Sequence, residues 1–190
     1  MRPAICCAIL IMSGCVSMPI EGLATPGKME GWKVGSAHDS GRGKGTIVEF
    51  VPATESINNW QHLATIQFME GVHLSPDAAM LQLENSMKIR CPDHTEWRVL
   101  SEGPHDVIYE WRIHSCPGQE GQVEIARIMQ GNDGLHRIAY TEKGDTMNLQ
   151  SREEWMGVLK SAYVTKGDTN HPIQLTNNSQ SDHLEAITSL

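Results

Sequence analysis

The stretch "HDVIYEWRIHS", His105–Ser115, decides the fold. Its apolar and polar residues alternate: Val107, Tyr109, Trp111 and Ile113 are interleaved with Ile108, Glu110, Arg112 and His114. Side chains of a strand point to opposite faces in turn, so a two-residue period of this length predicts a β-strand with one buried face. The stretch is therefore the clearest strand that the sequence predicts.

Similar, shorter alternation on both sides of this stretch predicts six more strands. The first of them begins at Trp32. The other five cover residues 46–51, 62–70, 96–100, 122–129 and 135–141. Turn residues separate neighbouring strands, with "GRGKG" at 41–45 and "GNDG" at 131–134. Short turns between consecutive strands indicate an antiparallel sheet.

Two segments change to a helical period. The first begins at Ser75-Pro76-Asp77, where a cap residue, a first-turn proline and an acid stand together, and Pro92 ends it. Its apolar face contains Met80, Leu83, Met87 and Cys91. The second begins with a capping box at Ser151–Glu154 and has an apolar face of Trp155, Val158, Leu159 and Ala162.

Together these elements predict one α+β domain over residues 30–165, an antiparallel sheet of about six or seven strands covered by two helices. The order of the elements resembles that of PsbP-like α/β/α sandwiches. Residues 166–190 are polar and weakly patterned, and we expect them to form a flexible tail.

The chain opens with Met1-Arg2 and the uncharged run "PAICCAILIM". This run is about half as long as a bilayer-spanning helix, which needs roughly 20 residues, and is typical of a signal peptide. It ends in Met12-Ser13-Gly14-Cys15, which resembles the lipobox of bacterial lipoproteins. The resemblance implies a signal peptide at 1–14, acylation of Cys15 and a linker at 15–29. It also implies that the protein lies on the outer membrane and faces the periplasm, because Val16-Ser17 follows the cysteine in place of an inner-membrane retention signal. The inner membrane and a plain secretion signal remain alternatives.

Two of the five cysteines, Cys91 and Cys116, remain once the signal peptide and Cys15 are set aside. An even pair in an oxidising compartment predicts a disulfide. The alternative is a zinc site formed by Cys91, His94, His114 and Cys116, since four N and S ligands suit tetrahedral zinc. The spacing is not that of a standard zinc finger, and we expect no metal or other cofactor.

The net charge of −8 and the lack of a basic stripe argue against nucleic acid as a partner. The sequence contains no G-x-S-x-G, H-E-x-x-H or phosphate-binding glycine loop, so we expect no enzymatic activity and assign no catalytic residue. Trp60, in the loop "INNWQ", has no apolar partner in the pattern and is a candidate protein contact.

These observations favour a non-enzymatic, lipid-anchored subunit of an envelope or secretion complex, with the membrane and other envelope proteins as partners. Two alternatives stay open. A periplasmic carrier of a small apolar ligand or lipid would contain a large apolar cavity, and an unrecognised periplasmic enzyme would contain a cleft with converging titratable groups.

Overall fold

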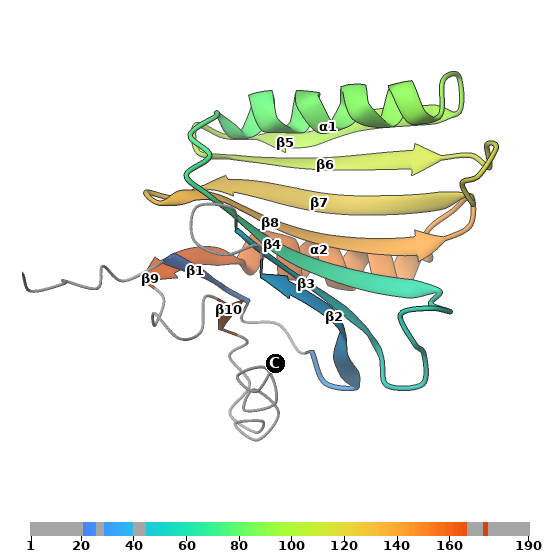
Figure 1. The fold of residues 1–190 in the computed structure, drawn as a ribbon, viewed down its shortest axis with the longest axis horizontal. Helices are drawn as coiled ribbons and strands as arrows, with labels where there is room; N and C mark the ends of the chain where they lie inside the picture. Colours follow the sequence, from blue (N-terminus) through green and yellow to red (C-terminus); the bar gives the residue numbers. More distant parts are fainter. Residues whose placement is uncertain (1–20, 26–28, 40–44, 167–172, 175–190) are drawn as a thin grey trace, which may run out of the picture.

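The computed structural model describes residues 21–25, 29–39, 45–166 and 173–174. Its main body is a seven-stranded antiparallel sheet with the order β2-β3-β4-β8-β7-β6-β5 (Figure 1). The strands are β2 (Trp32–Asp39), β3 (Thr46–Pro52), β4 (His62–Glu70), β5 (Thr95–Glu102), β6 (Asp106–Ile113), β7 (Gln122–Gln130) and β8 (Gly134–Lys143). The predicted α+β fold and its seven strands are confirmed.

Helix α1 (Pro76–Arg90) covers one face of the sheet at β5, β6 and β7. Met80 is buried against this face, and Leu83 and Met87 pack beside it. These are three of the four residues on the predicted apolar face, and the fourth, Cys91, is completely buried at the carboxyl end of the helix. The methionines therefore fill the core between helix and sheet.

Helix α2 (Leu149–Ser161) covers the opposite face at β7 and β8. Trp155 stacks on Tyr140 of β8, with ring centres 4.7 Å apart, and Trp32 of β2 meets Trp155 edge-on at 5.4 Å. The helix begins before the predicted capping box. The side chain of Asn148 accepts hydrogen bonds from the backbone N–H groups of Gln150 and Ser151, so Asn148, not Ser151, is the N-cap.

A second, small sheet contains three strands in the order β10-β1-β9: β1 (Glu21–Ala24), β9 (Tyr163–Lys166) and β10 (Ile173–Gln174). Strand β1 lies inside the range assigned to a linker, and β10 lies inside the range assigned to a flexible tail. All four β1 residues are buried and β10 pairs with β1, so residues 21–24 and 173–174 belong to a sheet and not to a linker or a flexible tail. The strands have four residues or fewer and pair across the whole length of the chain, so local periodicity carries no signal for them.

Glu21 attaches β1 to the turn between β7 and β8. Its carboxylate accepts hydrogen bonds from Asn132 Nδ2 at 2.6 Å and from the backbone N–H of Asp133 at 3.0 Å. One carboxylate oxygen also lies 3.7 Å from Nε2 of His136, which is 1% exposed and stacks on Phe68. Burial is the main influence on His136 and lowers its pKa below the usual 6.5, although the nearby Glu21 and Asp133 act in the opposite direction.

This arrangement predicts a loss of stability on mild acidification. The unfolded chain takes up a proton at His136 as the pH falls through about 6.5, whereas the folded chain does not, so the free energy of unfolding falls below that pH, by at most about 1.4 kcal/mol per pH unit for this group. His136→Phe keeps a ring beside Phe68 and removes the titration. In denaturant unfolding, we expect the free energy of unfolding of this variant to change less between pH 7.5 and 5.5 than that of the unchanged protein. An equal change would show that His136 does not cause the pH dependence.

A buried carboxylate connects β6, β7 and β8 on the α1 face. Glu124 accepts hydrogen bonds from Trp111 Nε1 at 2.7 Å and from Thr141 Oγ1 at 3.0 Å, and it forms an ion pair with Arg137. Arg137 Nε in turn donates to Tyr109 Oη at 3.0 Å. Burial raises the pKa of Tyr109 to about 12, so its hydroxyl stays protonated. Each member of the cluster has a partner, as a buried polar group requires.

Glu124→Gln should lower the free energy of unfolding by about 3 kcal/mol, because it leaves the Arg137 charge in the core without a counter-charge. Glu120→Gln is the matched control, since Glu120 pairs with Lys143 at the surface and its side chain is 76% exposed. The control should change stability by less than about 1 kcal/mol. Equal effects of the two changes in denaturant unfolding would show that the buried ion pair is not a main stabilising contact.

Candidate functional site

A cluster of charged side chains lies on β5 and β6, beside the part of the sheet that α2 covers. The same tripeptide, Glu-Trp-Arg, occurs at 96–98 in β5 and at 110–112 in β6. The two strands are antiparallel with Glu96 opposite Arg112, Trp97 opposite Trp111, and Arg98 opposite Glu110. Antiparallel pairing of the two copies thus places a glutamate opposite an arginine in two successive rows.

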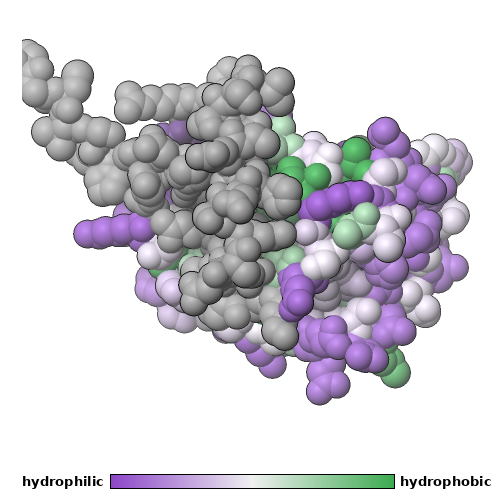
Figure 2. Space-filling view, turned by 90° about the horizontal axis from the view of Figure 1, so that it is seen from below, coloured by the Kyte–Doolittle hydropathy of each residue, from purple (hydrophilic) through white to green (hydrophobic). Residues whose placement is uncertain are grey.

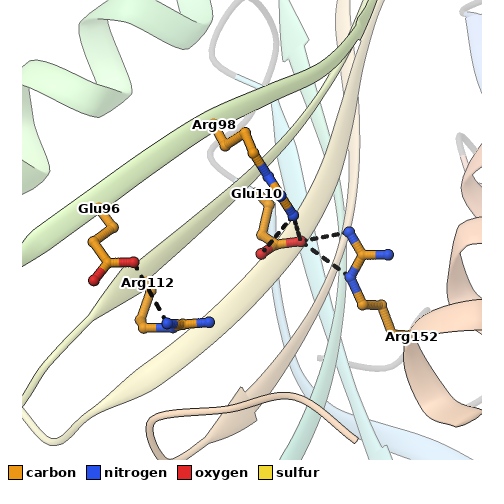
Figure 3. Close-up of polar contacts among 5 residues, drawn as sticks. All are labelled: Glu96, Arg98, Glu110, Arg112 and Arg152. Atoms are coloured by element: carbon orange, nitrogen blue, oxygen red, sulfur yellow. Dashed lines mark hydrogen bonds and ion pairs between the residues drawn. The ribbon is translucent and has the colours of Figure 1, made fainter. Parts of the chain in front are cut away.

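Glu110 is the centre of the cluster. Arg98 NH2 lies 3.3 and 3.2 Å from its two carboxylate oxygens, and Arg152 of α2 approaches from the other side through Nε at 3.1 Å and NH2 at 2.6 Å (Figure 3). The Glu110 side chain is 14% exposed, whereas that of Arg98 is 63% exposed. The carboxylate is therefore held from two elements, and Arg98 extends into solvent.

Glu96 forms a second, more exposed group of ion pairs. Its carboxylate oxygens lie 3.4 Å from Arg112 NH1 and 2.8 Å from His114 Nε2, and His114 Nδ1 is 3.5 Å from Asp145. The hydrogen bond with Glu96 raises the pKa of His114 above its usual value, and the same bond lowers the pKa of Glu96. The contacts with Glu96 and Asp145 thus stabilise the protonated form of His114 relative to a histidine in water.

The tryptophans of the two tripeptides point to the opposite face and fix the strands there. Trp97 stacks on Tyr109 with ring centres 4.9 Å apart, and Trp111 is bonded to Glu124. Because side chains alternate along a strand, packing of the buried Trp111 and the partly buried Trp97 on this face turns the neighbouring charges to the other face. The indole Nε1 of Trp97 and Nε of Arg112 are buried without a hydrogen-bond partner.

An open hollow of about 400 Å³ lies at this surface, and its lining residues are the six residues of the two tripeptides. Glu110 is paired with Arg98 and Arg152, and Glu96 is paired with Arg112 and His114, so neither carboxylate is without a partner. In the described part of the chain, no group of three or more His, Cys, Asp and Glu side chains is placed to bind one metal ion. The arrangement suits recognition of charged groups on another molecule.

Of the site residues that the sequence predicts, only His114 belongs to the charged cluster, and the others lie elsewhere. Cys15 and the signal peptide fall outside the described residues. Within the described residues, no helix has the length and apolar character needed to cross a membrane. Trp60 is half-buried. Lys143 Nζ lies 5.1 Å from the centre of its ring, so one face of the ring is in a cation–π contact within the chain. Its role as a protein contact stays a prediction.

Cys91 and Cys116 lie at disulfide distance, with their Cα atoms 6.0 Å apart, in agreement with the predicted pairing. The bond connects the carboxyl end of α1 to the loop after β6. Of the two histidines in the zinc alternative, His114 belongs to the charged cluster through Glu96 and Asp145, and His94 is exposed.

The charged cluster itself was not identified from the sequence. The repeated Glu-Trp-Arg was the available signal, because two copies on neighbouring antiparallel strands produce crossed Glu–Arg pairs in one register. The contribution of Arg152 could not be read in this way, since it depends on how α2 crosses the sheet.

The structure thus defines an α+β domain with an antiparallel sheet and a charged surface on two of its strands. No family model matches the chain, and no curated protein matches it. Solved structures with partial similarity to the chain include a point mutant of protein Mog1, with a TM-score of 0.47, 11% identity, and coverage of 74% of this chain and 88% of that chain. Another is cyanobacterial PsbP (CyanoP) from Synechocystis sp. PCC 6803, with a TM-score of 0.45, 9% identity, and coverage of 82% and 99%.

Reduction of the disulfide should lower stability, because the bond closes a loop with a sequence separation of 25 residues. The chain-entropy model gives about 3.5 kcal/mol for a loop of this length. The check is denaturant unfolding with and without reductant, compared with a Cys91→Ala/Cys116→Ala variant that reductant should not affect. Mass spectrometry of non-reduced peptides should join the two cysteines, and recovery of both as free thiols from an oxidising compartment would contradict the pairing.

Proposed function

We propose that the protein is a non-enzymatic accessory subunit of a bacterial envelope complex, anchored to the membrane by lipid on Cys15 and bound to a partner protein through the charged surface of β5, β6 and α2. The observation that carries this proposal is the open cluster of arginines and glutamates on a part of the sheet that α2 does not cover. Arginine is enriched at protein interfaces and often contributes much of their binding energy.

The form of the hollow supports protein binding over the two alternatives. A carrier of apolar ligands needs an enclosed apolar cavity, whereas this hollow is open and four of its six lining residues are charged. An enzyme needs a nucleophile or a titratable group free to react, whereas both carboxylates are already in ion pairs.

The lower side of the molecule lies away from β5 and β6, which are at the top of Figure 1. Seen from that side, the coloured residues are mostly hydrophilic, and the hydrophobic ones form small groups (Figure 2). Specific recognition through polar groups depends on fixed geometry, and in the charged cluster the packing of Trp97 and Trp111 and the Glu110 ion pairs support it.

Affinity purification from envelope extracts in mild detergent tests both parts of the proposal. The lipidated protein should recover a defined set of envelope proteins, and Cys15→Ala should lose acyl labelling and release the protein from the membrane. Arg112→Ala/Arg152→Ala should lower partner recovery at least tenfold, since it removes two cations from the surface. Arg90→Ala, on the exposed end of α1, is the matched control and should leave recovery unchanged.

Three results would contradict the proposal. If Cys15→Ala associates with the membrane as strongly as the unchanged protein does, lipid on Cys15 is not the anchor. If Arg112→Ala/Arg152→Ala unfolds like the unchanged protein and still recovers the same partners, the partner binds at another surface. Recovery of a bound lipid in place of a protein would favour the carrier.

A further inference from the structure

Strand β5 is an edge of the seven-stranded sheet, and among the described residues it pairs with β6 alone. The backbone N–H of His114 donates to the carbonyl oxygen of His94 at 2.9 Å. Directly opposite residues of an antiparallel pair are hydrogen-bonded at every second position, so Glu96 and Arg98 bond to β6 in the same way. The N–H and C=O groups of Thr95, Trp97 and Val99 therefore point outward from the edge.

The same Glu-Trp-Arg sequence already pairs with itself once in this fold, between β5 and β6. The pairing is antiparallel and centred on Trp97 and Trp111, so that each glutamate lies opposite an arginine. A third copy of this sequence, arriving antiparallel at the free edge of β5, would meet the same complementary charges. The β5 strand of a second molecule carries such a copy.

We propose that two copies of this protein associate through their β5 edges, antiparallel about a two-fold axis at Trp97. In this register, the outward N–H and C=O of Trp97 bond to those of its counterpart, and Thr95 lies opposite Val99 of the second copy. Val99, whose side chain is 43% exposed, becomes covered on the α1 face. A two-fold contact of this kind uses the same surface on both molecules and closes on itself.

Charges decide the register. With Trp97 at the axis, Glu96 lies opposite Arg98 of the second copy, and each row across the interface reads Arg112, Glu96, Arg98, Glu110, with alternating sign. The two neighbouring registers that keep the backbone hydrogen bonds place Glu96 opposite Glu96, or Arg98 opposite Arg98. Like charges directly opposite each other destabilise a strand pair, so one register is favoured. This inference is independent of the proposed partner protein and of the lipid.

The experiment uses two charge reversals on the full chain in detergent, measured by sedimentation velocity over a concentration series. Arg98→Glu alone and Glu96→Arg alone each put like charges opposite each other twice in the dimer, and each should raise the dissociation constant about tenfold. Mixing the two variants should restore association as a heterodimer, because one chain then carries acidic side chains at both positions and the other carries basic side chains at both. Arg90→Glu, with the same change of net charge as Arg98→Glu, should associate like the unchanged protein.

A cross-linking test covers the case in which either reversal fails to fold. A chain with Arg98→Cys and a chain with Glu96→Cys should form a mixed inter-chain disulfide faster than either forms one alone, because these positions lie directly opposite each other. A monomeric unchanged protein at every concentration, or association that the mixture fails to restore, would overturn the inference and make the charges a protection of the edge against pairing. Partner recovery in the Arg112→Ala/Arg152→Ala test is scored separately, so either proposal can fail alone.

Discussion

A carboxylate in the interior of a sheet has to be neutralised, and in this protein the requirement at Glu124 determines the position of three strands. The carboxylate needs Trp111 of β6 and Arg137 and Thr141 of β8 at the same time. A slip of one residue would turn each of these side chains to the other face and leave a charge in the core without a counter-charge. The ion pair therefore specifies register in the middle of the sheet, where apolar side chains alone would tolerate alternatives.

The charged surface follows from this constraint. Trp111 is held to the α1 face by its bond to Glu124, and Trp97 follows it by stacking on Tyr109. Strand geometry then turns Glu96, Arg98, Glu110 and Arg112 together to the face where α2 supplies Arg152. The same pair of strands thus presents a mainly apolar layer to α1 and an ion-pair layer to solvent. Of these charged groups, the Glu110 carboxylate is the one held from two elements, by Arg98 of β5 and Arg152 of α2.

The sequence predicts elements whose stabilising contacts repeat along the chain. Alternation located all seven strands of the main sheet, and the Ser75-Pro76 start located α1. The capping box misplaced the start of α2, because Asn148 satisfies the free N–H groups one turn earlier. Strand β1 could not be predicted, since it is held by the Asn132–Asp133 turn and by β9, which lie more than 100 residues away. The charged cluster could be predicted only in part. The repeated tripeptide predicts its crossed pairs, but Arg152 joins the cluster only through tertiary packing.

The position of β1 also limits how the domain can lie relative to a membrane if Cys15 carries lipid, as proposed. Only five residues separate Cys15 from Glu21. An extended chain covers at most about 3.6 Å per residue, so the start of β1 would lie within roughly 22 Å of the lipid. Strand β5 forms the edge of the sheet on the other side of the molecule from β1 (Figure 1). A tether at β1 thus leaves the β5 edge free, and confinement of two copies to one membrane raises their effective concentration for a short strand-to-strand contact that would be weak in dilute solution.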